Sequence, residues 1–156
     1  MEDFDKYINR NKNINRGYRK LEVWKEAIEL FALVKNKLAS CDTISFKTKA
    51  QIEDSALSVP SNIAEGYSRR HLKENIQFNT ISLSSLSENY SQIFALVVSK
   101  DIDKPWFDYY DSKHYSIENK LINLNKTLVS KLKYGTDWKN DYIIRELIEL
   151  YNNEES

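Results

Sequence analysis

The sequence predicts an all-α protein: an up-down-up-down four-helix bundle with a short extra C-terminal helix. Apolar residues recur at spacings of three and four along four long segments, and the connections between these segments are short. Only three glycines and two prolines occur in 156 residues, too few for the tight turns of an all-β fold. We therefore expect a mobile N-terminal arm over residues 1–17, the bundle over 18–132, and an acidic C-terminal helix and tail over 133–156.

The first two predicted helices run from about Tyr18 to Ala39 and from about Phe46 to Arg69. Pro60 lies inside the second, where it lacks the N–H that bonds back to the carbonyl four residues earlier, so we expect a kink or break there. Gly66 permits a close approach of another helix or a helix end. The apolar stripes comprise Leu21, Trp24, Ile28, Phe31 and Leu38 in the first helix and Ile52, Ala56, Val59, Ile63 and Tyr67 in the second.

Two further long helices are predicted from about Leu72 to Ser99 and from Pro105 to Leu132, and a short fifth from Trp138 to Asn152. Proline suits the first turn of a helix, and Asp137 can cap the last one. The inward residues expected are Leu72, Ile76, Leu83, Leu86, Tyr90, Ile93 and Val97, interrupted by Asn79, and then Trp106, Tyr110, Ile117, Leu121, Leu124, Leu128 and Leu132. The fifth helix has its own stripe of Ile143, Ile144, Leu147, Leu150 and Tyr151.

Composition excludes several classes of protein. No apolar run approaches the roughly 20 residues needed to span a bilayer, and the first residues do not resemble a secretory signal, so we expect no membrane association. A single cysteine, Cys41, fits a reducing cytoplasm. The 23 basic and 23 acidic residues balance, which argues against nucleic-acid binding over the whole surface.

Catalytic and metal-binding patterns are missing from the sequence. Nucleophilic catalysis and zinc sites both call for histidine or cysteine, and the chain offers only Cys41, His71 and His114, far apart in sequence. No glycine-rich phosphate loop occurs. We therefore expect a protein that is not an enzyme and that takes no cofactor or metal; an enzyme with an unrecognised site around His114 is the weakest alternative.

Two basic clusters are the candidate contacts for nucleic acid or an acidic partner. They comprise Arg69, Arg70 and Lys73 at one helix junction and Arg16, Arg19 and Lys20 before the first helix. The alternative is a solvated helix end, where cations complement the helix dipole. The sequence does not decide between a ligand contact and a solvated helix end.

Aromatic residues crowd the start of the fourth predicted helix. Trp106, Phe107, Tyr109 and Tyr110 span more than one helical face, so they cannot all point into one core. They form either an extended core edge or an oligomer interface, where tryptophan and tyrosine are enriched. We favour the interface.

Three segments together resemble one known family. They are LEVWKEA at 21–27, SVPSNIAEGY at 58–67, and the stretch from Phe78 to Glu88. The chain resembles the bacterial four-helix-bundle proteins encoded by intervening sequences of 23S ribosomal RNA, also called S23 ribosomal proteins, over about residues 18–132. The accessory variability proteins of diversity-generating retroelements are similar. The motif is carried by Trp24, Gln51, Ser58, Pro60, Asn62, Ile63, Ala64, Glu65 and Gly66.

The resemblance implies a small cytoplasmic protein without known catalysis that assembles into a ring-like homopentamer. It also implies, as the alternative, an accessory protein that binds RNA or DNA and acts with ribosomal RNA or a reverse transcriptase. The sequence departs from the family pattern where Glu53 and Asp54 replace basic residues, which argues against nucleic-acid binding. It also has Ser84 in place of a glycine and Asn75 in place of an aromatic residue. The motif residues are expected to fix the fold or the assembly.

Overall fold

A computed structural model describes residues 4–69 and 71–134, and the elements in these ranges are all helical. The prediction of an all-α protein is therefore confirmed. The elements are α1 (Asp5–Asn9), the 3-10 helix η2 (Ile14–Lys20), α2 (Glu22–Ala39), α3 (Phe46–Ser68), α4 (Leu72–Val98) and α5 (Lys104–Lys133). The predicted fifth helix at 138–152 lies outside the described residues.

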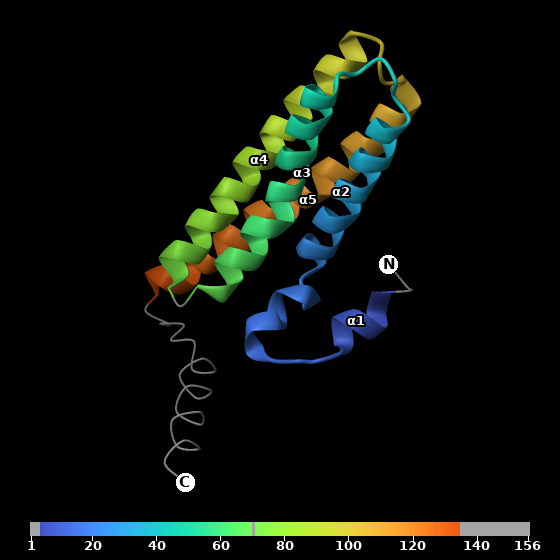
Figure 1. The fold of residues 1–156 in the computed structure, drawn as a ribbon. Coiled ribbons are helices and arrows are strands. Elements are labelled where there is room, and N and C mark those ends of the chain that lie inside the picture. The colour runs from blue at the N-terminus through green and yellow to red at the C-terminus, as the bar shows by residue number, and fades with distance from the viewer. Residues whose placement is uncertain (1–3, 70, 135–156) are drawn as a thin grey trace.

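The four long helices lie side by side (Figure 1). Helix α2 packs against α3 and α5, and α4 packs against the same two helices, with the α3–α4 pair in the most extensive contact. The α2–α3 and α4–α5 connections lie at one end of the molecule, whereas η2 and the α3–α4 connection lie at the other. None of the described helices is both long enough and apolar enough to cross a membrane.

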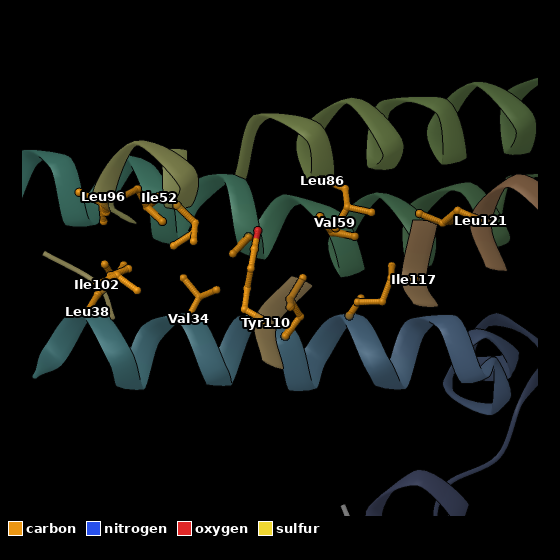
Figure 2. Packing of buried hydrophobic residues seen from close by; sticks show 14 of the residues in the cluster. Val34, Leu38, Ile52, Val59, Leu86, Leu96, Ile102, Tyr110, Ile117 and Leu121 are labelled. Atoms are coloured by element: carbon orange, nitrogen blue, oxygen red, sulfur yellow. The ribbon is translucent and has the colours of Figure 1, made fainter. Parts of the chain in front are cut away.

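The core lies along the axis between the four helices (Figure 2). Each helix contributes fully buried side chains, such as Val34 of α2, Val59 of α3, Leu86 of α4 and Ile117 of α5. Burying one such side chain is worth about 1.5–3 kcal/mol, so these layers hold the helices together. Cys41 and Ile102, in the two connections, close one end of the core.

The first long helix begins at Glu22, four residues later than predicted. Leu21 has an extended backbone (φ −72°, ψ 122°), which separates α2 from η2. Residues 14–20 instead form the 3-10 helix, whose first turn is capped by the Asn13 side chain accepting from the Arg16 amide at 3.1 Å. Tyr18, expected inside the first helix, packs edge-on against Trp24, with ring centroids 5.3 Å apart.

Helix α3 is continuous through Pro60, so of the predicted kink or break the break does not occur. Side chains next to the proline bond to carbonyls of the preceding turn: Ser61 Oγ donates to the Leu57 carbonyl and Asn62 Nδ2 to the Ser58 carbonyl, both at 2.8 Å. These bonds hold the turn around the missing amide. At the other connection, Asp103 caps α5 by accepting from the Trp106 amide at 2.9 Å, with Pro105 in the first turn as predicted.

Candidate functional site

Polar side chains occupy the centre of the contact between α3 and α4. The buried positions of α4 follow heptad spacing and include Leu72, Leu86 and Ile93, as predicted, but most of the other buried positions hold Asn or Ser. Ile76, Leu83, Tyr90 and Val97 are only partly buried and flank the contact. We call the set at the centre the polar seam: Asn75, Asn79, Ser82, Ser85 and Asn89 of α4, with Ser55, Ser58 and Asn62 of α3.

Hydrogen bonds across the seam tie the two helices together. Ser82 Oγ donates to the Val59 carbonyl at 2.8 Å, directly before Pro60. The hydroxyls of Ser58 and Ser85 lie 2.8 Å apart, and Asn62 Nδ2 donates to Ser58 Oγ at 2.9 Å. Small side chains with short hydroxyl arms allow close packing while satisfying the buried polar groups. Ser58 of the motif therefore helps to hold α3 and α4 together.

Gly66 lets the end of α3 approach α4. A Cβ atom built on Gly66 would lie 2.7 Å from Cβ of Phe78 and 3.2 Å from the carbonyl oxygen of Asn75. No side chain fits there without displacing the helices, so glycine is required by the close approach. The position where the family has an aromatic residue, Asn75, is buried beside this contact.

Asn89 is the hub of the seam, and it was not predicted. Its Nδ2 donates to the Ile52 carbonyl and to Ser55 Oγ, both at 3.0 Å, and Tyr110 Oη donates to its Oδ1 at 2.8 Å. Ser55 Oγ also lies 2.7 Å from Gln92 Oε1. Burial raises the pKa of the Tyr110 phenol, reinforced by neighbouring Tyr90 and Asp111, so the phenol stays a hydrogen-bond donor. The signal in the sequence was a recurrence of Asn and Ser at heptad spacing.

The remaining motif residues have separate positions. Pro60 and Ile63 are buried on α3, Ala64 and Trp24 are half-buried, and Glu65 pairs with Arg69. Gln51 is exposed and lines a polar groove of about 420 Å³ on the outer side of the α3–α4 contact. Of the departures from the family, Asp54 lines the same groove, Glu53 is half-buried, and Ser84 is exposed.

His114 and Cys41 are both buried, and each lies within hydrogen-bond distance of backbone carbonyls. Buried His114 has its Nε2 2.9 Å from the Leu86 carbonyl, and its ring centroid lies 4.9 Å from that of Tyr90. Buried Cys41 has its thiol near the carbonyls of Lys37 and Asp101, at 3.3 and 3.6 Å. Within residues 4–69 and 71–134, no three His, Cys, Asp or Glu side chains are grouped as metal ligands would be.

The structure brings the two basic clusters to one end of the molecule, although Arg70 lies outside the described residues. Helix η2 packs against the end of α3, where Tyr18 faces Tyr67 with ring centroids 6.4 Å apart. A pocket of about 580 Å³ forms there, lined by Tyr67, Lys12, Arg16, Arg19 and Lys20 among others. Its openings carry positive charge, which suits a phosphate or carboxylate group.

Several of these cations already have partners. The Arg19 guanidinium donates to the carbonyls of Tyr7, Arg10 and Asn11 at 3.0–3.2 Å, so it holds the N-terminal arm in place. Arg69 pairs with Glu65 and lies over the Phe78 ring, 4.7 Å from its centroid. Arg16 donates one bond, to the Asn11 carbonyl at 3.3 Å.

Lys20 and Lys73 are exposed and form no ion pair within the described part of the chain. Lys20, Lys73 and Arg16 are therefore the cations most available to a ligand at this end. The described residues contain twenty Lys and Arg against fifteen Asp and Glu. This part of the chain therefore carries a net positive charge, although the whole chain is neutral.

The four aromatic residues predicted for an oligomer interface do not share a face. Tyr110 is fully buried in the core, so its assignment to an interface was wrong. Trp106 stacks on Tyr110 and has the Lys37 ammonium 5.6 Å from its ring centroid, whereas Tyr109 is exposed next to Lys113. Successive helix positions are about 100° apart, which spreads the four side chains around α5.

Phe107 does belong to an exposed aromatic cluster. Its ring centroid lies 5.8 Å from those of both Tyr90 and Phe94, and Phe94 is 48% exposed. We call Tyr90, Phe94 and Phe107 the aromatic face. Val98, one turn further along α4 than Phe94, is 68% exposed. The sequence predicted Tyr90 on the inward stripe of its helix and Phe107 at an interface, and did not place the two together.

The sequence model for 23S rRNA-intervening sequence proteins matches residues 19–123. No curated protein matches the chain.

Proposed function

The chain belongs to the family of 23S rRNA-intervening sequence proteins, and from this premise we propose that it is a non-enzymatic scaffold. Its unit is an up-down-up-down four-helix bundle, and copies of this unit associate into a homo-oligomer of the cytoplasm. Five copies form the particle, as the family resemblance implies. The polar groups that could suggest chemistry, His114 and the seam asparagines, bond within the fold.

The aromatic face is the observation that carries this proposal. Phe94 and Phe107 are in contact across α4 and α5, and Phe94 leaves about half of its surface in water. Aromatic side chains are enriched in protein interfaces, and each one removed from water contributes about 1.5–3 kcal/mol. Contact with another copy covers this face.

Light scattering of a variant tests the interface. Phe94→Lys places a charge on the aromatic face, and we expect the particle mass to fall toward 18.4 kDa, the mass of one chain. Phe46→Lys is the matched control, because Phe46 is 87% exposed and belongs to α3, which contributes no residue to the aromatic face. An unchanged mass for Phe94→Lys, with the fold intact by circular dichroism, contradicts the proposed interface.

RNA binding is the second candidate function, favoured by the position of the basic residues. Arg16, Lys20 and Lys73 lie at the end of the molecule where the pocket beside Tyr67 opens. If several copies assemble, repeated weak contacts strengthen one another through avidity. Contact with RNA phosphates releases counterions, so the affinity falls as salt rises.

Fluorescence anisotropy with a single-stranded ribosomal RNA fragment tests this function. We expect Lys20→Ala combined with Lys73→Ala to weaken binding and to reduce the salt slope by roughly 0.7 for each phosphate that the variant no longer neutralises. Lys47→Ala combined with Lys49→Ala is the control, because these residues lie at the start of α3, at the opposite end. Binding that does not depend on salt in the unmodified protein rules out this function.

A further inference from the structure

We propose that residues 138–152 dock as an amphipathic helix into an apolar groove between α4 and α5 of their own chain. The groove has a volume of about 530 Å³. Its floor comes from Ile76 and Leu83 of α4 and from Ile122 and Val129 of α5. This surface lies on the outer side of the bundle and is separate from the aromatic face.

The groove leaves apolar surface uncovered by the described residues. Val129 in the groove is 47% exposed, and Leu132, which was predicted to point inward and does not line the groove, is 39% exposed. Ile122 is exposed as well. Three exposed aliphatic side chains within three turns of α5 are typical of a helix that lacks a packing partner on one side.

The sequence after α5 supplies a segment with a matching pattern. Ile144, Leu147 and Tyr151 recur at spacings of three and four, and Ile143 and Leu150 widen the same stripe. Such a stripe buries itself only by packing on another apolar surface. The stripe and the groove are thus apolar surfaces of one chain that could cover each other.

The connection is short enough to deliver the segment to the groove. Tyr134, the residue after α5, itself lines the groove, and only residues 135–137 separate it from the start of the predicted helix. Gly135 follows directly, and glycine accepts the left-handed conformation that reverses a chain after a helix. The docked helix would run back along α5 as an αα-hairpin.

The lengths agree. Ile122 and Val129 are seven residues apart, about 10 Å along α5 at 1.5 Å per residue. Ile143 and Tyr151, the ends of the stripe, are eight residues apart, about 12 Å on the same scale. A tether of three residues also raises the effective concentration of the segment to about the millimolar range, which favours the groove of the same chain over that of another copy.

The charge of the C-terminal segment is also complementary to that of the groove rim. Residues 135–156 contain six acidic residues and two basic ones. Lys126 and Lys133 lie at the rim of the groove. Acidic groups beside this rim gain modest attraction, of about 0.2–1 kcal/mol per exposed pair. Docking therefore also reduces the positive charge of the end of the molecule that carries Lys20 and Lys73.

Cross-linking between engineered cysteines tests the docking. In a Cys41→Ser background, Val129→Cys is combined with Leu147→Cys and treated with a short bismaleimide. We expect a cross-link within one chain, formed at least about fivefold faster than in the control pair Val98→Cys with Leu147→Cys. Val98 is at least as exposed as Val129 but lies at the far end of α4.

Equal rates for the two pairs overturn the proposal. A cross-link that joins two chains also overturns it, because the segment then covers the groove of another copy. Hydrogen exchange gives a second readout: Leu147→Asp should speed exchange at residues 122–134, and unchanged exchange there contradicts the docking. Neither readout depends on the aromatic face, so they fail or succeed separately from the scaffold proposal.

Discussion

Tyr110 and Asn89 are joined inside the core by a hydrogen bond of 2.8 Å from the phenol to the amide oxygen. Both side chains are completely buried. The amide nitrogen of Asn89 also donates to the Ile52 carbonyl in the backbone of α3. One tyrosine of α5 is thereby linked through α4 to α3. This relationship fixes the relative rotation of three of the four long helices.

Tyr110→Phe should destabilise the protein by about 1–3 kcal/mol, because it leaves the buried Asn89 amide oxygen without its donor. Urea unfolding followed by circular dichroism measures the change. Tyr109→Phe serves as the control, since Tyr109 is 54% exposed and its hydroxyl can bond to water. Equal stability of the two variants would show that the bond contributes nothing.

Asn79→Leu is expected to cost much less stability than Asn89→Leu, because it loses only the bond of 3.2 Å from Asn79 Nδ2 to Asn75 Oδ1 and removes an unsatisfied acceptor. The amide oxygen of Asn79 is buried and has no hydrogen-bond partner within the described part of the chain, whereas Asn89 satisfies three partners. An unsatisfied buried acceptor costs about 1–3 kcal/mol, which leucine removes. The free energies of unfolding of the two variants should differ by at least about 2 kcal/mol. A similar loss in both variants contradicts this account.

Glu26 should contribute a pH-dependent part of the stability. Burial alone raises its pKa, but hydrogen bonds from Lys120 and Ser116 and the charge of Lys120 outweigh burial, and the pKa is lowered overall. A carboxyl with a lowered folded pKa stabilises the protein above its unfolded pKa, and this contribution is lost as pH falls through the folded value.

The comparison of the unmodified protein with Glu26→Gln measures that contribution. We expect the variant to unfold more easily at pH 7, by about 0.5–1 kcal/mol, and the difference to shrink as the pH falls below the unfolded pKa and through the lowered folded pKa. Glu22→Gln is the control, since its side chain is 68% exposed in its pair with Lys25. A difference that stays constant from pH 7 to pH 3 would contradict the assignment.

Arg19→Ala should release the N-terminal arm. The guanidinium of Arg19 donates to three backbone carbonyls of residues 7–11, so its removal breaks the bonds that close the arm on η2. Chymotrypsin cleavage after Tyr7 should become faster, by about tenfold if roughly 1.4 kcal/mol of local stability is lost. Arg16→Ala removes one such bond and should have a smaller effect. Equal cleavage rates in both variants would count against this role.

The sequence predicted the long helices well because their signal is local. Spacings of three and four locate a helix and one of its faces, and α3, α4 and α5 begin and end within about two residues of the predicted bounds. The start of α2 was missed, because the extended backbone of Leu21 depends on the packing of η2 against α3. Pro60 was expected to kink or break α3, but the helix does not break, and neighbouring side chains hold that turn together.

The site could be predicted only in part. The motif around Pro60 was identified, and the reading of its polar residues as structural agrees with the bonds of Ser58 and Asn62. The polar seam of α4 was missed, because a hydrophobicity pattern assigns Asn75 and Asn89 to the surface. Their burial depends on partners in other helices, such as Tyr110 and the Ile52 carbonyl. Tyr110 was correctly placed on the inward stripe of α5, and only its second assignment, to an oligomer interface, was wrong.

Sedimentation velocity of the unmodified protein over a wide concentration range tests the central proposal most directly. A homo-oligomeric scaffold predicts one species at a multiple of 18.4 kDa, five times that mass for a pentamer, that persists on dilution. A single species at 18.4 kDa at every concentration would contradict the scaffold and leave the aromatic face without its proposed partner.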